Sequence, residues 1–357
     1  MKSAAGFIKA FKTMTRTILE VQGLCKSYRA PRRWWAGLGS GAQTIPAVDD
    51  VSFYIKQGET LGLVGETGCG KTTIGRTILK LTAADAGRII FDGSDITHLS
   101  AARFRPFRSQ MQMIFQDLDA ALNPKMRIEA ILKEALHMRQ DRAEGSMDQR
   151  IGELLAQVNL KKSKLSNFPS ELSGGEKRRV GIARALAVGA RFIVADEPTS
   201  ALDVSIQAQV VNLLKSLQEQ LGLSYLFITH DLRIVELISH KVAVMYLGQI
   251  VETGLSGRIA HRPHHPYTHS LWSSLVEKQS HEASCLGADA CHGAWGIYDF
   301  DRPSDGCRFA PRCPVYEQRG RPAICTESES APRLRDIGDA HKVACHFPLQ
   351  QQSDEST

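Results

Sequence analysis

No stretch of this 357-residue sequence approaches the roughly 20 uninterrupted apolar residues that a membrane-spanning helix needs. The best apolar runs, such as residues 224–229, have only the length of a strand. The N-terminus also lacks the apolar core of a secretory signal, because Lys9 and Lys12 interrupt it and no small-residue cleavage site follows. We therefore expect a chain that stays in the cytoplasm and reaches a membrane only through partners.

The chain also lacks a dominant charge, since 44 basic and 38 acidic residues give a net charge of +6. An excess this small and dispersed does not by itself indicate nucleic-acid binding, and we expect no nucleic-acid partner. Only near the N-terminus do basic residues gather, with Glu20 as the single acid before Trp35. We interpret residues 1–16 as a basic segment that is either a solvated tail or a contact for an anionic membrane surface or partner loops.

Composition and length are those of a folded globular protein, with 43% apolar and 23% charged residues. A chain of this size forms one large or two modest domains, which excludes a single small module. Short apolar runs alternate with helical stretches, which predicts an α/β core, and several runs are continuous, as in strands covered on both faces. The runs are residues 60–64, 111–115, 191–195, 224–228 and 241–247. No internal repeat is present, so we expect one core rather than a tandem pair.

Two regions depart from this alternation. Residues from about 117 to 180 lack strand-like runs and are rich in helix formers, which predicts a helical insertion. From about Pro263 onward Pro, His, Cys and Arg become frequent and periodicity fades, which indicates an irregular C-terminal extension. We therefore predict a domain at 17–270, with a β-rich N-terminal part and the helical insertion, followed by a Cys-rich extension at 271–357.

The most specific motif is a phosphate-binding loop. The pattern G-x-x-x-x-G-K-[ST] is matched, between a strand-like run and a helix-compatible run, by Gly65, Glu66, Thr67, Gly68, Cys69, Gly70, Lys71 and Thr72. Its glycines let backbone N–H groups curl around phosphates at the positive end of the following helix. We expect Lys71 to reach the β and γ phosphates of ATP and Thr72 to give its hydroxyl to Mg²⁺, with Thr73 beside them.

A carboxylate pair complements this loop. The apolar run 191–195 ends in Asp196 and Glu197. Asp196 is expected to hold Mg²⁺, directly or through water, and Glu197 to polarise the attacking water. An acidic strand end alone is often only a helix cap, but together with a phosphate loop it indicates nucleotide hydrolysis.

With these motifs the sequence resembles the ATPase subunits of ABC transporters, because Leu-Ser-Gly-Gly-Glu at residues 172–176 precedes the carboxylates at that family's spacing. A hydroxyl, flexible backbone amides and a helix N-terminus together make an anion site. The resemblance implies that Ser173, Gly174 and Gly175 contact the γ-phosphate of ATP held by an opposing subunit, so that hydrolysis needs a dimer. Glu176 stands where the family usually has Gln.

The same resemblance implies a P-loop NTPase core of the ABC-ATPase type and assigns four more residues. Tyr28 matches the aromatic residue that stacks on adenine, and Gln116 matches the glutamine that senses Mg²⁺ and the permease. Asp203 lies in the loop that crosses the dimer interface in that family. His230 matches the histidine that bridges Glu197 to the γ-phosphate. Alone, each of these residues has an ordinary structural interpretation.

Residues 119–126 and 264–268 are similar to the oligopeptide/dipeptide importer branch of that family, as are residues 306–314 and 343–346. Altogether the resemblance covers about residues 18–346. It implies a peripheral subunit on the cytoplasmic face of the inner membrane that powers uptake of peptides or related small solutes. The implied partners are a second ATPase subunit, identical or paralogous, two permeases and an extracytoplasmic solute-binding protein.

Two other functions fit parts of the sequence. A soluble ABC ATPase of nucleic-acid repair or translation usually carries tandem cores or a long coiled-coil insertion, and the sequence predicts neither. An accessory ATPase of a phosphonate-degrading complex shares the Asn-Pro stretch at residues 123–124.

Four of the eight cysteines, Cys307, Cys313, Cys325 and Cys345, lie within forty residues of one another. Structural disulfides are not expected in a reducing cytosol. The gaps of five, eleven and nineteen residues fit neither a usual zinc ribbon nor a common ferredoxin run. A cluster, zinc and free or transiently oxidised thiols all remain open on the spacing alone.

The family resemblance favours a four-iron four-sulfur cluster on these cysteines over zinc. Either metal centre would staple a weakly cored segment, because metal binding contributes folding energy. His341 and His346 are candidate substitute ligands. Cys285 and Cys291 match no pattern, and we expect no chemistry from them.

Overall fold

The larger of two sheets is built on strands whose residues are almost all buried. The computed structural model describes residues 16–29, 44–139, 145–279 and 306–349. Five parallel strands run in the order β9-β3-β8-β7-β6. They are β3 (Thr60–Val64), β6 (Met111–Ile114), β7 (Phe192–Asp196), β8 (Ser224–Ile228) and β9 (Lys241–Tyr246). Every residue of β3, β7 and β8 is buried, as strands covered on both faces require. The predicted α/β core is confirmed.

The described residues that follow β10 (Gln249–Leu255), here called the C-terminal segment, continue this sheet on one side. Beyond β9 lie three antiparallel strands, β10, β12 (Lys342–Val343) and β11 (Arg335–Asp336). The C-terminal residues are less irregular than their composition indicates, because β12 pairs with the backbone of β10. In addition, α11 (Pro266–Gln279) forms a regular helix.

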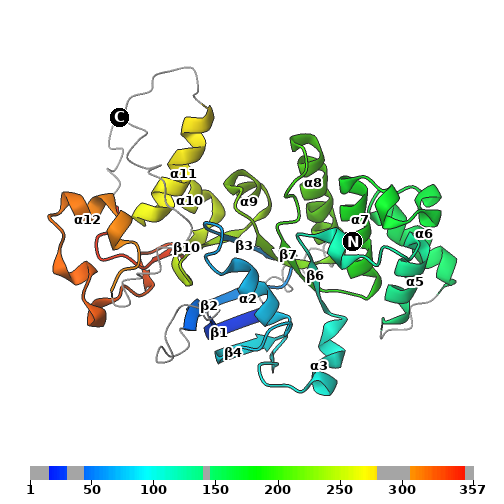
Figure 1. The fold of residues 1–357 in the computed structure, drawn as a ribbon, viewed down its shortest axis with the longest axis horizontal. Coiled ribbons are helices and arrows are strands. Elements are labelled where there is room, and N and C mark those ends of the chain that lie inside the picture. Colours follow the sequence, from blue (N-terminus) through cyan, green and yellow to red (C-terminus); the bar gives the residue numbers. More distant parts are fainter. Residues whose placement is uncertain (1–15, 30–43, 140–144, 280–305, 350–357) are drawn as a thin grey trace, which may run out of the picture.

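A second, antiparallel sheet has the order β2-β1-β4-β5. Its strands are β1 (Thr17–Arg29), β2 (Thr44–Lys56), β4 (Ala86–Phe91) and β5 (Ser94–Asp95). Helix α2 (Lys71–Ile78) lies between the two sheets, where Ile74 and Ile78 are buried in one cluster with side chains from both (Figure 1). The prediction of a β-rich N-terminal part is confirmed.

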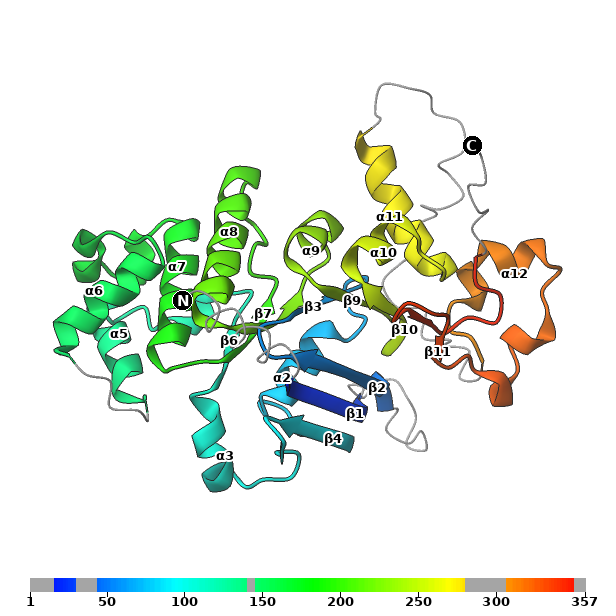
Figure 2. The ribbon, with the colours of Figure 1, turned by 180° about the vertical axis from the view of Figure 1, so that it is seen from behind.

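The helical insertion stands at the opposite end of the molecule from the C-terminal segment (Figures 1 and 2). It contains α4 (Leu118–Ala121), α5 (Ile128–His137), α6 (Met147–Gln157), α7 (Gly174–Ala187) and the 3₁₀ turns η1 (Lys162–Ser166) and η2 (Pro169–Glu171). The apolar faces of α5 and α6 pack against α7, where Ile131, Leu155 and Val180 are buried together.

The remaining helices flank the sheets. Above the main sheet in Figure 1 lie α8 (Val204–Leu221), α9 (Leu232–Ile238), α10 (Ser256–His261) and α11, and below it lies α3 (Ala101–Arg108). The C-terminal segment adds α12 (Pro314–Gln318), η4 (Ala310–Arg312), η5 (Ala323–Cys325) and η6 (Ser328–Ser330). Among the described residues, no helix combines the length and apolarity needed to cross a bilayer.

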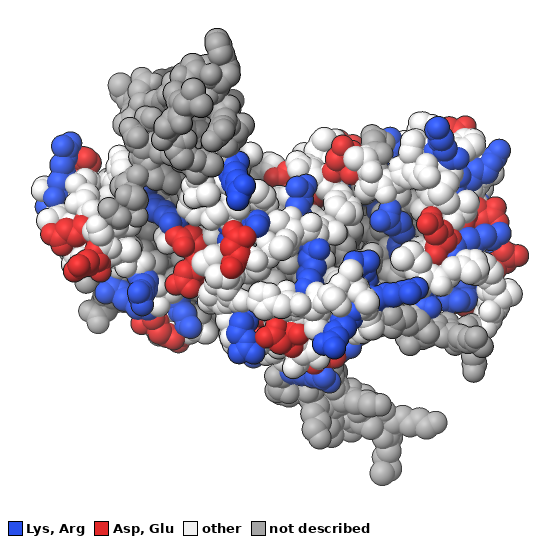
Figure 3. Space-filling model, turned by 60° about the horizontal axis from the view of Figure 1, so that its bottom comes forward, with Lys and Arg blue, Asp and Glu red and all other residues white. Residues whose placement is uncertain are grey.

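Charged side chains of both signs are interspersed over the face that Figure 3 presents. The described part of this face therefore has no continuous positive patch of the kind that attracts a polyanion such as nucleic acid.

A buried carboxylate fastens the C-terminal segment to the main sheet. Glu252 of β10 is fully buried and accepts hydrogen bonds from the backbone N–H groups of His264 (2.7 Å) and His265 (3.0 Å). His341 Nε2 donates to the same carboxylate at 2.7 Å. Burial by itself raises the pKa of Glu252, but hydrogen bonds from His341 and the two backbone N–H groups lower it below its ordinary value of 4.5.

We predict that Glu252→Gln lowers the free energy of unfolding by about 2 kcal/mol at neutral pH, because an amide leaves buried donors facing an N–H group. Since the folded pKa is depressed, the stabilisation is complete above the unfolded pKa, about 4.3, and is lost as the pH falls through the folded value. Melting temperatures of wild type and variant should therefore converge only as the pH falls through the depressed folded pKa. The exposed substitution Glu236→Gln is the control, and equal melting of Glu252→Gln and wild type at neutral pH would contradict this role.

Candidate nucleotide-binding site

The phosphate loop between β3 and α2 can be formed only with glycine at two of its positions. Gly65 has φ +150° and Gly70 has φ +110°. A Cβ atom at Gly65 would lie 2.1 Å from the carbonyl oxygen of Met245, and one at Gly70 would lie 2.0 Å from that of Ala47. Because these obstacles are backbone atoms, the loop can be packed this tightly only without side chains there.

Lys71 folds back into this loop. Its side chain is 5% exposed, and Nζ donates to the carbonyl oxygens of Gly65 and Glu66, both at 2.8 Å. Thr72 and Thr73 follow in the first turn of α2. Cys69 is buried beside the ammonium group, and burial raises the pKa of its thiol. The arrangement places one cation and a helix N-terminus where a phosphate chain would bind.

The hydroxyl and the first carboxylate of the predicted Mg²⁺ site lie together, although they are 124 residues apart in sequence. Thr72 Oγ1 donates to Asp196 Oδ1 at 3.0 Å. Asp196 is 2% exposed, and burial raises the pKa of its carboxyl group. Two adjacent hard oxygen donors beside a phosphate loop fit Mg²⁺, which prefers such ligands together with phosphate oxygens.

Three predicted catalytic residues meet at the carboxyl ends of neighbouring parallel strands, with Gln116 after β6, Glu197 after β7 and His230 after β8. Gln116 Nε2 donates to Glu197 Oε2 at 2.8 Å, and His230 Nδ1 lies 3.0 Å from Glu197 Oε1. Glu197 has φ +46°, a strained conformation for a residue other than glycine, and its N–H is held by the carbonyl oxygen of Ile228. Strain at a carboxylate fixed from two sides is typical of a functional position.

Ser173 caps helix α7. Its Oγ accepts from the N–H of Glu176 at 3.3 Å, and Glu176 Oε2 accepts from the N–H of Ser173 at 3.0 Å, which completes a capping box. Lys164 Nζ lies 2.9 Å from Glu176 Oε1. Hydrogen bonds from Lys164 and from Ser173 lower the pKa of Glu176. The Glu that replaces the usual Gln thus serves as a helix cap whose charge is balanced by Lys164.

The Ser-Gly-Gly turn at residues 173–175, here called the signature turn, does not meet the phosphate loop within this chain. A Cβ atom at Gly175 would lie 2.9 Å from Ile206 Cγ2 of α8, and one at Gly174 would lie 3.1 Å from Leu202 Cδ2. Within the described ranges, no hydrogen bond links residues 173–175 to residues 65–72. Figures 1 and 2 both show α7 beside α5 and α6, apart from α2. The two elements that the sequence predicts to contact phosphate therefore lie apart within this chain.

Tyr28 and Asp203 have simpler surroundings. The Tyr28 ring on β1 is 43% exposed, with Lys26 Nζ 5.7 Å from its centroid. Asp203 caps α8, and its Oδ1 accepts from the N–H of Ile206 at 2.9 Å. This hydrogen bond lowers the pKa of Asp203.

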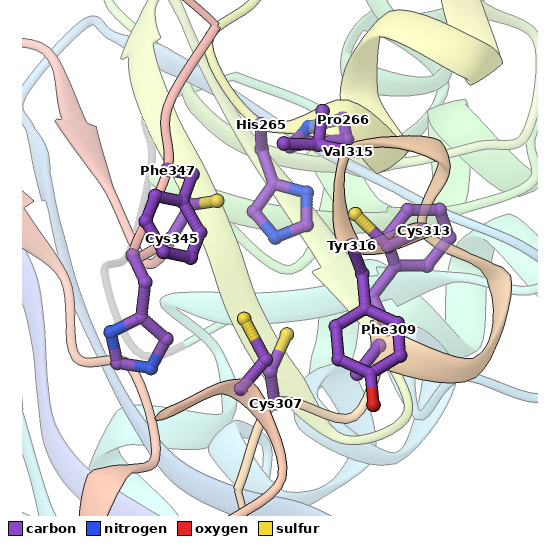
Figure 4. Close-up of a pocket in the computed structure, with 12 residues that line it drawn as sticks. His265, Pro266, Cys307, Phe309, Cys313, Val315, Tyr316, Cys345 and Phe347 are labelled. Carbon is purple, nitrogen blue, oxygen red and sulfur yellow. The ribbon is translucent and has the colours of Figure 1, made fainter. Parts of the chain in front are cut away.

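The C-terminal cysteines that the sequence grouped together also lie together in space. One pocket is lined by Cys307, Cys313, Cys325 and Cys345, and by His265, His346, Phe309, Phe347, Val315, Tyr316, Ala310 and Pro266. Figure 4 shows the sulfur atoms of Cys307, Cys313 and Cys345 turned toward the space around His265. Cys285 and Cys291 lie outside the described residues.

The four thiols lie in a largely apolar setting, which favours the neutral form of a thiol. Burial raises the pKa of Cys307 to about 11 and that of Cys345 to about 12, and it also raises those of Cys313 and Cys325. Among the described residues, no three His, Cys, Asp or Glu side chains are arranged so that they could hold a metal ion.

The two histidines proposed as substitute ligands differ. His346 lines the pocket, and its buried Nε2 has no hydrogen-bond partner among the described residues. His341 does not line the pocket, because its Nε2 is held by the buried Glu252 carboxylate, so its expected role as a ligand is corrected.

Comparisons with known proteins agree with this geometry. The sequence model of the ABC transporter family matches residues 48–200, and that of the oligopeptide/dipeptide transporter C-terminal region matches residues 251–319. The oligopeptide transport ATP-binding protein AppF of Bacillus subtilis is 43% identical over 304 residues, covering 85% of this chain and 90% of AppF. The chain belongs to the ABC transporter family of ATP-binding proteins.

Other relatives of this ABC protein support the same assignment. The oligopeptide transport ATP-binding protein OppF of Streptococcus mutans is 51% identical over 237 residues, covering 66% of this chain and 77% of OppF. A solved dimeric structure of the ATP-binding cassette MJ0796, in a post-hydrolysis state with ADP and phosphate, is 26% identical with a TM-score of 0.58. It covers 67% of this chain and 98% of MJ0796.

One buried cation of this ABC protein escaped the sequence analysis. Arg178 of α7 is 6% exposed, and its Nη1 donates to the carbonyl oxygen of Phe115 at 2.7 Å. Nη2 donates to Ser200 O at 3.3 Å. Arg178 thereby joins the signature helix to the backbone before Gln116 and to the loop after Glu197. The sequence carries no signal for it, because Lys177 and Arg179 flank it and have the same charge.

Proposed function

We propose that this ABC protein is the ATP-binding and ATP-hydrolysing subunit of an importer of oligopeptides or related small solutes. One observation carries the proposal: the phosphate loop and the Asp196, Glu197, Gln116 and His230 side chains that accompany it stand in the same chain as a C-terminal region of the oligopeptide/dipeptide transporter type. AppF and OppF, whose names describe oligopeptide transport, support the choice of solute. They also favour import over an accessory role in phosphonate breakdown or a role in nucleic-acid repair or translation.

The geometry supports a defined role for each catalytic residue. Glu197 accepts a proton from water as the water oxygen attacks the γ-phosphorus, and the bond to the β–γ bridging oxygen breaks to give ADP and phosphate. Gln116 and His230 hold the Glu197 carboxylate from two sides. Lys71 stabilises negative charge on the β and γ phosphates. Thr72 and Asp196 would hold Mg²⁺, and Gln116 would also contact it. The charge of the ion would offset the negative charge of the phosphates.

A second ATPase subunit completes each site in this proposal. The turn at residues 173–175 would contact the γ-phosphate of ATP on the opposing chain, across an interface that includes Asp203. The separation of this turn from the phosphate loop and the dimeric arrangement of MJ0796 support it. Tyr28 would stack on adenine. The assembly would bind two permeases at the cytoplasmic face of the inner membrane, fed by an extracytoplasmic solute-binding protein.

We predict that Glu197→Gln retains ATP binding but lowers turnover by roughly 100-fold or more, because an amide cannot accept the proton. The variant should accumulate as a dimer with Mg-ATP, measured by sedimentation alongside phosphate release. The exposed substitution Glu219→Gln on α8 should leave both unchanged. Turnover of Glu197→Gln near the wild-type rate would refute the role of Glu197.

Import itself is tested by purification of the tagged chain from membranes of its own cell. We expect two integral membrane permeases to co-purify, and vesicles holding the complex to accumulate labelled short peptides only with ATP and a solute-binding protein. Recovery of nucleic acid or lyase subunits without permeases would overturn the import hypothesis while leaving the ATPase site intact.

We also propose that Cys307, Cys313, Cys325 and Cys345 bind a four-iron four-sulfur cluster, with zinc as the alternative. Four sulfur donors lining one largely apolar pocket fit the soft-ligand chemistry of such a cluster, and the unpartnered His346 Nε2 offers a further donor. A bound cluster would supply cross-linking between the short elements of residues 306–349. Because the thiols must draw together and lose their protons, binding would be coupled to folding.

We predict about four iron atoms and four sulfides per chain in protein purified without oxygen. Cys313→Ser should lower both, since it removes a ligand, whereas Cys25→Ser on β1, outside the pocket, should not. Iron and acid-labile sulfide are measured together with zinc. One zinc per chain and no sulfide would defeat the cluster in favour of the alternative.

A further inference from the structure

An ion pair joins the cysteine-bearing segment to the phosphate loop. Arg312 lies between Cys307 and Cys313 in the sequence, and its guanidinium group forms two parallel hydrogen bonds with the Glu66 carboxylate. Nη1 to Oε2 and Nη2 to Oε1 are both 2.9 Å. A bidentate pair fixes direction as well as distance, unlike an ordinary surface contact.

Every polar group of Glu66 is engaged. Its N–H donates to the hydroxyl of Tyr267, at 3.0 Å, and Tyr267 is buried at the start of α11. Its carbonyl oxygen accepts from Lys71 Nζ at 2.8 Å and from the N–H of Cys69 at 3.3 Å. The C-terminal segment thus holds the side chain and the N–H of Glu66, while Lys71 holds the next peptide group.

Arg312 is itself held in place. Its guanidinium carbon lies 5.8 Å from the Tyr246 ring centroid and 6.0 Å from that of Phe309, within the range of cation–π contact. Tyr246, Tyr267 and Phe309 pack on one another with centroids 4.6 to 5.4 Å apart. In the same segment Arg308 bonds to the Leu247 carbonyl oxygen and the Asp49 carboxylate. Because these packed rings hold the Arg312 guanidinium group independently of Glu66, Arg312 can determine the position of the Glu66 side chain.

We propose that Arg312 is a positioning residue for ATP binding: acting through Glu66, it holds the phosphate loop and the Lys71 ammonium in the shape that receives phosphate. The C-terminal segment is then part of the nucleotide site's support. This inference rests on the proposed ATPase function for its kinetic consequence, but not for its structural one.

The test compares Arg312→Met, which keeps the apolar stem and removes the guanidinium group, with Arg321→Met. Arg321 belongs to the same segment and pairs with Glu317 on the surface, so it is the matched control. We expect Arg312→Met to raise the KM for ATP about fivefold, the usual size for a half-exposed ion pair with good geometry, and to change kcat less than twofold. The KM of Arg312→Lys should lie between those of wild type and Arg312→Met, because a single ammonium group cannot bind bidentately.

Hydrogen exchange of the amides of residues 65–72 in nucleotide-free protein gives a readout independent of activity. We expect faster exchange in Arg312→Met and Glu66→Gln and no change in Arg321→Met. The charge-reversed pair Glu66→Arg with Arg312→Glu should recover protection and KM relative to either single change. The exchange of residues 306–349 is followed in each variant. If Arg312→Met speeds exchange within that segment, the comparison is made with Arg312→Lys and Glu66→Gln instead.

Unchanged KM and unchanged exchange of residues 65–72 in Arg312→Met would overturn the proposal. So would a double variant, Glu66→Arg with Arg312→Glu, whose loss of protection and rise in KM equal the sum of the effects of the two single changes. Wild-type protein that hydrolyses no ATP would instead defeat the proposed function. In that case the exchange data still decide whether Arg312 positions the phosphate loop.

Discussion

Strands β3, β7 and β8 are buried at every position, as strands of a sheet covered on both faces are. Parallel strands in such a sheet all end at one edge, and the nucleotide site is built along that edge. The phosphate loop follows β3, Glu197 follows β7 and His230 follows β8, while Gln116 follows the neighbouring β6. Residues as much as 124 positions apart meet there at hydrogen-bond distance because the sheet requires their strands to be neighbours.

The C-terminal segment depends on a second kind of interaction, the pairing of buried or half-buried charge. Its own core is small, since its helices and strands are only two to five residues long after α11. Glu252 fastens it to β10 through the N–H groups of 264 and 265 and through His341. Arg308 and Arg312 fasten it to the turn after β9 and to the phosphate loop. These polar contacts add to the apolar packing of Phe309 against Tyr246 and Tyr267 in positioning the segment.

The signature turn shows how local chemistry and assembly are combined. Ser173 and Glu176 complete a capping box, so the start of α7 is well formed without any partner. Among the described residues, the N–H groups of that first turn make no hydrogen bond to the phosphate loop of the same chain. In our proposal an opposing subunit brings its nucleotide to them, and the Lys164 contact keeps the charge of Glu176 from repelling it.

The sequence by itself determined the five parallel strands of the main sheet, the helical insertion and the nucleotide motif, because continuous apolar runs and the Gly65 to Thr72 spacing have few other physical solutions. It also grouped the four C-terminal cysteines, which the structure places around one pocket. Tertiary structure alone decided the rest. Arg178 is buried, although no sequence pattern distinguishes it from Lys177 and Arg179, which have the same charge. His341 contacts Glu252 rather than the cysteines. The bond between Arg312 and Glu66 spans 246 residues, and no local periodicity or spacing reports a contact whose partners are brought together only by the packing of the whole sheet.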